Sequence, residues 1–425
     1  MSSHFKWNPY ADQPHNVASR SKRLKHHLGH AHAYLEILSK NICLAFPVIS
    51  LYRSYTKLMY HVPLKIGDSC GVSVSPLEGR NEEIVKFLSE TGVKKTLVRI
   101  PSWERERIKS YENFLKLLFL RGFEVTVALL QNRDDVLEGI RWRSFLREAF
   151  LRFSPFSSFF EVGHAWNRTK WGVWNHREYL ELVKPALELA RFHGVKLVGP
   201  AVIDFEFHLY PPVLAEIPFD VVSSLLYVDR KGAPENKQFG FNLSKKVALL
   251  RAIVDCCAAE GLELWITEMN WPLKGTGKYS PAAGRPNVSE KEQADYLIRY
   301  FILSLASGMV KRVYWWQLVS PGYGLIDNRN QPWRKRPSFS ALKNMISFLQ
   351  GSEFKGKEFH PKAQVFNFRK SGQDFAICWL KGPSLEIEYS FSRKVSRLMN
   401  RSGEEILPVG KRIKLTQSPI YVFFT

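Results

Sequence analysis

Eight short apolar segments alternate with helical segments between residues 66 and 351, and this alternation constrains the fold more than any other feature of the sequence. The apolar segments are rich in Val, Ile and Leu, as parallel strands buried on both faces are. The intervening segments repeat apolar residues with the helical period, and several end in glycine, a common helix stop. We therefore predict parallel strands joined by crossover helices, and eight such units close a (β/α)8 (TIM) barrel.

The predicted strands are residues 70–76, 95–103, 124–131, 159–166, 195–206, 219–228, 262–272 and 311–321. The predicted helices are residues 81–92, 111–122, 139–153, 177–194, 212–218, 245–261 and 290–308. Segment 212–218 is short for a helix, so the unit that contains it is the weakest. An open, doubly wound sheet is the alternative architecture, but no glycine-rich phosphate loop follows an early strand.

Two further regions flank the barrel. Residues 352–425 consist of short alternating runs separated by turn signals, which predict a small antiparallel β-sandwich domain. We expect this domain to support the barrel, and the sequence leaves open whether chain from before the barrel joins its sheets. Residues 1–65 form a basic extension, in which the apolar segment Asn41–Tyr52 has Lys and Arg on both sides. Packing on the barrel and resting on an anionic membrane surface are both compatible with this segment.

The net charge of +21 should attract phosphate, acidic glycans, nucleic acid or an anionic membrane. Nucleic acid is disfavoured, because no helix-turn-helix, ribonucleoprotein motif or zinc-finger spacing is visible and the basic residues are spread along the chain. Five scattered cysteines form neither a disulfide framework nor a metal-ligand cluster. Without a secretory signal motif, these features predict a cytoplasmic protein, or one at the inner membrane face, that needs no cofactor or metal. They say nothing about its oligomeric state.

Polar and aromatic residues gather where the predicted strands end. The catalytic groups of a (β/α)8 barrel lie at the carboxyl ends of its strands, and polar groups buried there without partners are costly. Aromatic rings at the same end suit the C–H faces of sugars. We therefore expect a saccharide or glycoconjugate as the ligand, and the positive charge favours an anionic one.

Two of these strand ends resemble a known family. The segment Leu264–Pro272, LWITEMNWP, and the segment 312–345, which begins RVYWWQLVSPGYG, resemble the seventh and eighth strands of the (β/α)8 glycoside hydrolases in the large retaining clan that includes cellulases, β-xylosidases and α-L-iduronidase. The resemblance implies that Glu268 is the nucleophile and Trp316 the sugar platform. It also implies that Arg99 on the second strand holds the nucleophile ionised and that Tyr227 on the sixth orients it.

The fourth strand departs from this pattern. Its end, Glu161–Asn167 (EVGHAWN), aligns with a clan motif in which the general acid/base is a glutamate, and here that place holds Ala165. A methyl group cannot deliver the proton that retaining hydrolysis needs. We therefore take Glu206 and His164 as candidates for a relocated acid, ahead of the deeper Glu161.

Ala165 is also compatible with two hypotheses that need no relocated acid. The enzyme could use an activated, phosphate-linked glycosyl donor or transfer sugar instead of hydrolysing it, which needs less acid assistance. Alternatively, the barrel is catalytically degraded and binds glycan without turnover. The predicted catalytic residues are Glu268, Glu206 and His164, and the predicted substrate-binding residues are Arg99, Trp103, Trp166, Asn167, Asp204, Tyr227, Asn270, Trp271, Trp316 and Gln317.

Overall fold

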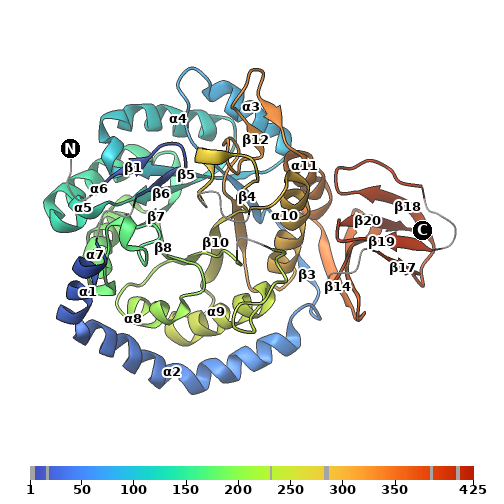
Figure 1. Ribbon diagram of the computed structural model, residues 1–425, viewed down its shortest axis with the longest axis horizontal. Helices are drawn as coiled ribbons and strands as arrows, with labels where there is room; N and C mark the ends of the chain where they lie inside the picture. The colour runs from blue at the N-terminus through green and yellow to red at the C-terminus, as the bar shows by residue number, and fades with distance from the viewer. Residues whose placement is uncertain (1–4, 16–18, 230–231, 282–286, 383–385, 408–411) are drawn as a thin grey trace.

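The computed structural model describes residues 5–15, 19–229, 232–281, 287–382, 386–407 and 412–425. Its centre is a closed barrel of eight parallel strands, surrounded by helices (Figure 1). The barrel strands are β4 (Cys70–Val74), β5 (Lys95–Pro101), β6 (Glu124–Leu130), β7 (Ser157–Val162), β8 (Lys196–Ile203), β9 (Val221–Leu225), β10 (Glu263–Met269) and β11 (Arg312–Trp315). Strand β11 pairs with β4 through Val313 and Cys70, which closes the ring. The predicted (β/α)8 barrel is confirmed.

The helices follow the strands as the periodicity predicted. They are α3 (Asn81–Thr91), α4 (Ile108–Leu120), α5 (Arg133–Leu137), α6 (Gly139–Phe153), α7 (His176–His193), α8 (Tyr210–Leu214), α9 (Leu243–Cys257), α10 (Glu290–Leu305) and α11 (Pro337–Leu349). Helix α8 has only five residues, so the segment with the weakest helical signal in the sequence is also a very short crossover helix. The long α10 is fixed at its start by a capping box between Ser289 and Glu292.

The barrel interior is packed with large side chains below the site. Trp265, Tyr314, Leu97 and Val198 belong to one buried cluster there. Gly71 is required at its position because a Cβ atom would collide with the ring of Tyr314. This packed floor leaves the open end of the barrel as the place where a ligand can enter.

The C-terminal residues form antiparallel sheets beside the barrel (Figure 1). The larger sheet has the order β18 (Val395–Asn400), β20 (Ile420–Phe424), β16 (Gln373–Leu380), β15 (Ala363–Lys370), β14 (Glu353–Glu358) and β3 (Leu64–Lys65), and a smaller one pairs β17 (Ile387–Tyr389) with β19 (Ile413–Leu415). Val365, Cys378, Tyr389 and Leu415 share one core between the sheets. Strand β3 comes from before the barrel, so that chain does join this domain.

The N-terminal extension lies against the barrel. It contains a hairpin of β1 (Trp7–Asn8) and β2 (Gln13–Pro14), then α1 (Arg20–Gly29) and the long α2 (Ala31–Leu58). Figure 1 shows α2 running along the outside of α8 and α9. The Asn41 side chain donates to the carbonyl of His208 at 2.8 Å, and the Tyr55 hydroxyl donates to Asp255 at 2.6 Å. Within the described residues, α2 is the one helix long and apolar enough to cross a membrane.

Candidate active site

A cavity of about 120 Å³ opens at the carboxyl ends of the barrel strands. The strand ends contribute residues to its wall, as expected for this fold. The wall is formed by Arg99, His164, Arg168, Lys170, Trp171, Ile203, Tyr227, Glu268, Asn270, Pro272, Pro281, Trp316 and Tyr323, together with Ala11, Asp12 and Gln13 of the N-terminal hairpin. Of the thirteen predicted site residues, Arg99, His164, Tyr227, Glu268, Asn270 and Trp316 therefore meet in one place.

Glu268 lies at the end of β10 and is only 7% exposed. Its Oε1 atom accepts a hydrogen bond of 2.7 Å from the Tyr227 hydroxyl. Its Oε2 atom lies 3.7 Å from Nη1 of Arg99. A buried carboxylate beside a guanidinium and a phenol is stabilised in its ionised form, as a nucleophile must be.

Arg99 is itself held rigidly between aromatic rings. Its guanidinium carbon lies 4.1 Å from the centre of the Trp316 ring and 5.4 Å from that of Trp171. Stacking on aromatic faces suits the planar guanidinium and leaves its edges free for carboxylates. The cation thus has a fixed place at the centre of the cavity.

His164 follows β7, and its Nε2 atom lies 3.6 Å from Glu268 Oε2. Its backbone amide donates to the Gln131 side chain at 2.8 Å, and that side chain donates back to the His164 carbonyl at 3.0 Å. Burial lowers the pKa of His164 well below its usual value, and the charges of Arg99 and Lys170 lower it further. His164 is therefore a neutral imidazole near pH 7, able to accept or donate a hydrogen bond but without a charge.

Ala165 is fully buried and has a positive φ of 42°. Its methyl group packs in a cluster with Trp171, Ala201 and Ile203 and is outside the cavity wall. The fourth strand end therefore offers no carboxylate at this position. It also offers little room for one.

The side chains of Glu206, Asp204 and Asn167 form a hydrogen-bonded cluster with Arg168 beside the cavity. Arg168 donates to Glu206 and, at 2.8 Å, to Asp204. The Asn167 amide donates to Glu206 at 2.9 Å and to the carbonyl of Ile203 at 2.9 Å. These three side chains are outside the cavity wall, and their contacts join the ends of β7 and β8.

The remaining predicted residues, apart from Asn270, are outside the cavity wall. Trp166 stacks on Tyr179 with ring centres 4.7 Å apart, and Trp271 packs against Tyr296 and Trp315 in the helix layer. Gln317 accepts a hydrogen bond from Ser75 at 3.2 Å, outside the cavity wall. The ring centres of Trp103 and of Trp7 in the N-terminal hairpin lie 5.1 Å apart. Asn270 lines the cavity and donates to the carbonyl of Tyr323 at 2.9 Å.

The N-terminal hairpin brings residues to the site that were not predicted from the sequence. Oδ2 of Asp12 lies 3.6 Å from Nη1 of Arg99 and accepts a hydrogen bond of 3.2 Å from the Tyr323 hydroxyl. The Gln13 side chain accepts from Lys170 at 2.6 Å and donates to the Pro281 carbonyl at 2.8 Å. A turn signal at Asn8 and Pro9 is visible in the sequence. That signal predicts the turn itself. It does not predict that the hairpin contacts residues nearly one hundred or more positions further along the chain.

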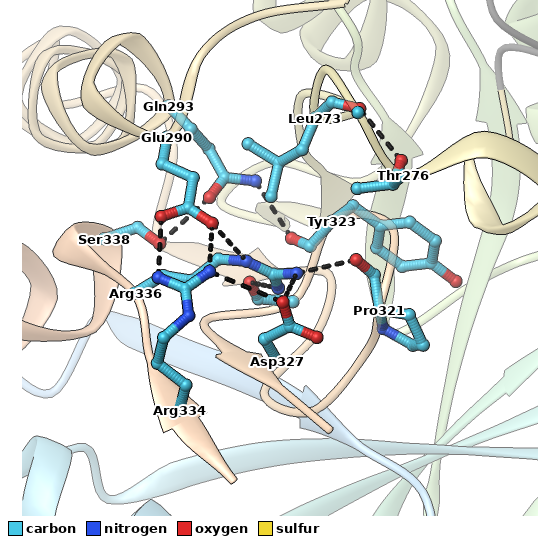
Figure 2. A network of polar contacts seen from close by, with 12 residues as sticks. Leu273, Thr276, Glu290, Gln293, Pro321, Tyr323, Asp327, Arg334, Arg336 and Ser338 are labelled. Carbon is cyan, nitrogen blue, oxygen red and sulfur yellow. Dashed lines mark hydrogen bonds and ion pairs between the residues drawn. The ribbon is translucent and has the colours of Figure 1, made fainter. Parts of the chain in front are cut away.

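A polar network behind the eighth strand holds the loop that carries Tyr323 (Figure 2). The fully buried Arg336 donates to the carbonyls of Ser320 at 2.8 Å, Pro321 at 2.6 Å and Gly324 at 2.7 Å. Satisfying three carbonyls with one guanidinium fixes the shape of the loop. Tyr323 is thereby directed toward the cavity.

Glu161 lies inside the barrel beneath Glu268. It accepts hydrogen bonds from Thr267 at 2.9 Å and Ser223 at 3.1 Å. Burial raises the pKa of Glu161 to about 8, with a further contribution from the charge of Glu268. The carboxyl group is therefore protonated near pH 7 and is outside the cavity wall.

The fold is similar to that of solved glycoside hydrolases. A family 39 glycoside hydrolase from Bacteroides cellulosilyticus has a TM-score of 0.66 at 16% identity, over 84% of this chain and 81% of that one. A family 51 arabinofuranosidase from Xanthomonas axonopodis has a TM-score of 0.58 at 12% identity, over 85% and 97% of the two chains. A family 30 endoxylanase from Clostridium papyrosolvens has a TM-score of 0.57 at 12% identity, over 86% and 99%.

No protein-family model and no curated protein sequence matches the chain. The structural likeness, at 12–16% identity for these three barrels, shows that the chain has the glycoside-hydrolase type of (β/α)8 fold. It does not by itself give an activity. An activity has to be argued from the cavity.

Proposed function

We propose that this protein is a glycosidase or transglycosidase in which Glu268 attacks the anomeric carbon of a saccharide or glycoconjugate. The observation that carries the proposal is the setting of Glu268: a buried carboxylate at the cavity wall, hydrogen-bonded to Tyr227 and next to Arg99. Nucleophilic carboxylates of retaining glycosidases need this combination of access, orientation and stabilised charge. Trp316 lines the same cavity, where its ring is stacked with the Arg99 guanidinium and would contact a sugar with the part that Arg99 leaves uncovered.

The cations of the wall bear on whether the substrate is anionic. Arg99, Arg168 and Lys170 all line the cavity, although Arg99 lies beside Asp12 and Glu268 and Arg168 is paired with Asp204 and Glu206. A carboxylate or phosphate on the saccharide would compete with these carboxylates for the cations, and the net charge of +21 would favour its approach. A phosphate-linked glycosyl donor is one such substrate, and its leaving group needs little protonation.

The test is turnover of aryl xylosides and arabinofuranosides, since xylan and arabinofuranosides are the substrates named for two of the structural neighbours. Glu268→Gln keeps the shape of the side chain and removes its charge, so turnover should fall below detection while ligand binding persists. Glu263→Gln, at the opposite end of the same strand, is the matched control and should retain turnover. Full activity of Glu268→Gln would refute the assignment.

A second candidate function is glycan binding without turnover. The observation that favours it is Ala165, which leaves the fourth strand without an acid. A degraded barrel would bind saccharides but turn over neither a plain glycoside nor an activated one. Glycosyl fluorides and glycosyl phosphates therefore separate the two candidates, because an intact nucleophile can attack them without a strong acid.

A further inference from the structure

We propose that Asp12, carried by the N-terminal hairpin, is the general acid/base that replaces the missing glutamate of the fourth strand. This inference rests on the proposed function of Glu268. It assigns a catalytic role to a residue that comes before the barrel in the chain. The alternation of strands and helices cannot predict site residues in that segment.

The Asp12 carboxyl group lies within reach of a sugar bound at Glu268. It belongs to the cavity wall, and its Oδ2 is 3.6 Å from the same Arg99 nitrogen that is 3.7 Å from Glu268 Oε2. The two carboxylate oxygens are therefore no farther apart than the sum of these distances. That limit includes the separation of about 5–5.5 Å between the paired carboxyl groups of retaining glycosidases.

The hairpin that carries Asp12 is fixed on the cavity. Gln13, next to Asp12, is bonded to both Lys170 and the Pro281 carbonyl. The ring of Trp7 contacts Trp103 at 5.1 Å and Trp171 at 6.1 Å. A catalytic group on a loop has to be held in this way if it is to meet the substrate in one geometry.

The pair of carboxyl groups favours one shared proton. Burial raises the pKa of Asp12; the charge of Arg99 and the hydrogen bond from Tyr323 oppose this, and the charge of Glu104 adds to it. Asp12 and Glu268 each accept a hydrogen bond from a tyrosine and each lie beside Arg99. Two carboxyl groups that share one site repel each other when both are ionised, so one of them tends to keep its proton.

The three acids considered from the sequence suit the role less well than Asp12. Glu206 is bonded to Arg168 and Asn167 outside the cavity wall. The lowered pKa of His164 keeps its imidazole neutral near pH 7. The imidazolium form, which would act as the acid, is therefore not populated. Glu161 is protonated but lies beneath the cavity, bonded to Ser223 and Thr267.

The reaction then balances in two steps. In the first, Asp12 gives its proton to the glycosidic oxygen, the bond from that oxygen to the anomeric carbon breaks, and Glu268 bonds to that carbon. In the second, the Asp12 carboxylate takes a proton from water as the water oxygen attacks the anomeric carbon. The electron pair of the ester bond returns to Glu268, and both groups are restored.

The test compares leaving groups. Asn tolerates the positive φ of 51° at this position, so Asp12→Asn preserves the hairpin while removing the proton donor. On methyl xyloside or methyl arabinofuranoside, Asp12→Asn should lower kcat/KM by about 10²- to 10⁴-fold. On the 2,4-dinitrophenyl glycosides of the same sugars, the formation of the glycosyl-enzyme should be much less affected. The fall in wild-type activity at high pH should also disappear in the variant.

The controls separate this proposal from the function on which it rests. Glu206→Gln should change kcat/KM by the same factor for substrates with either leaving group, because its side chain bonds to Arg168 and Asn167 outside the cavity wall. Equal losses on both leaving groups in Asp12→Asn, with Glu268→Gln inactive, would leave Glu268 in place and refute the role of Asp12. A wild type that turns over no glycoside of either kind would refute both.

We also propose that α2 rests on an anionic lipid surface, on the evidence of its exposed face. Leu35, Leu38, Ile42, Phe46 and Ile49 are all exposed, and their spacing of three or four residues places them on one stripe of the helix. The opposite face, which includes Ile37 and Val48, is buried against the barrel. An apolar stripe of this length in water is typical of a surface that meets a partner or a membrane.

The charges near this stripe favour lipid over a second copy of the chain. Arg53 and Lys57 continue the stripe toward the end of α2, and both are exposed. Two copies would bring these cations together, and each carries a net charge of +21. An anionic headgroup layer complements them. Asn41 and Tyr55 hold α2 against the barrel. We therefore expect the helix to lie along the lipid surface and not to cross the membrane.

Vesicle cosedimentation tests this second proposal with a matched pair of phenylalanines. Phe46 on α2 is 84% exposed and Phe192 on α7 is 83% exposed. The full chain should bind vesicles containing phosphatidylglycerol more tightly than vesicles of phosphatidylcholine alone. Phe46→Ser should weaken that binding by about tenfold, and Phe192→Ser should not change it. No preference for anionic vesicles, or a dimer in solution that Phe46→Ser dissociates, would overturn the proposal.

Discussion

The Tyr227 hydroxyl, two residues beyond the end of β9, donates a 2.7 Å hydrogen bond to Glu268 at the end of the neighbouring strand β10. This contact fixes which oxygen of Glu268 faces the phenol. The other oxygen lies toward Arg99 and His164. The two strand ends thus define the direction from which the carboxylate can attack.

Tyr227→Phe should lower kcat by about 10- to 100-fold, because a hydrogen bond to a charged group contributes about 1.5–3 kcal/mol. Substrate binding should change little, since the phenol contacts the carboxylate and not the sugar. Steady-state kinetics on an aryl glycoside measure the effect. Tyr60→Phe is the control, because the Tyr60 hydroxyl donates at 2.8 Å to the Leu303 carbonyl of α10, and neither residue belongs to the cavity wall. If both variants lose turnover equally, the contact has no special role in catalysis.

Arg336→Met should destabilise the protein by about 3 kcal/mol or more, since it leaves three carbonyls of the Tyr323 loop without their donor (Figure 2). Arg334 is the matched control. It is 53% exposed and pairs with Glu290 at the surface, so Arg334→Met should cost about 1 kcal/mol or less. Urea denaturation measures both free energies. A loss in Arg336→Met no larger than that in Arg334→Met would contradict the bracing role.

Glu161→Gln should remove a pH dependence of stability. The folded-state pKa of Glu161 is about 8, raised by burial, so between its usual value of 4.5 and 8 the folded state keeps a proton that the unfolded state has lost. Wild-type stability should therefore decline as pH rises through this window, at up to about 1.4 kcal/mol per pH unit, and level off above it. Urea denaturation from pH 5 to 9 measures the slope. An identical slope in wild type and Glu161→Gln would show that this carboxyl group does not cause it.

The barrel was predictable because its evidence is local and repeated. Each strand and helix carries its own period, so the weak signal of a single unit, such as the short α8, did not change the predicted fold. Glu268 and Arg99 were predicted from the resemblance of their strands to those of the retaining clan. The closed barrel then explains why the two side chains line one cavity, because the strand ends converge.

The rest of the site depends on long-range packing. Trp166 and Trp271 follow strand ends but turn outward to Tyr179 and Tyr296, because a loop, unlike a strand, has no fixed alternation of sides. Asp12 reaches Arg99 and Tyr323 from a hairpin with no periodic signal. The packing of Trp7 and Gln13 on the barrel helps to hold it there.

The alanine in the fourth strand allows a final prediction. Ala165→Glu would restore the carboxyl group of the clan motif in sequence, but the residue has φ of 42° and its side chain is fully buried in an apolar cluster. A longer, charged side chain there has to displace its packed neighbours and lose its hydration. We expect a loss of at least about 3 kcal/mol of stability and no gain in cleavage of plain glycosides.

Ala165→Gly provides the control for this prediction. Glycine adopts positive φ without strain, so the variant should keep its stability within about 1 kcal/mol. Thermal unfolding and kcat/KM on methyl xyloside measure both variants. Improved cleavage by a stable Ala165→Glu would show that the fourth strand can still host the acid, and the role proposed for Asp12 would then lose its main reason.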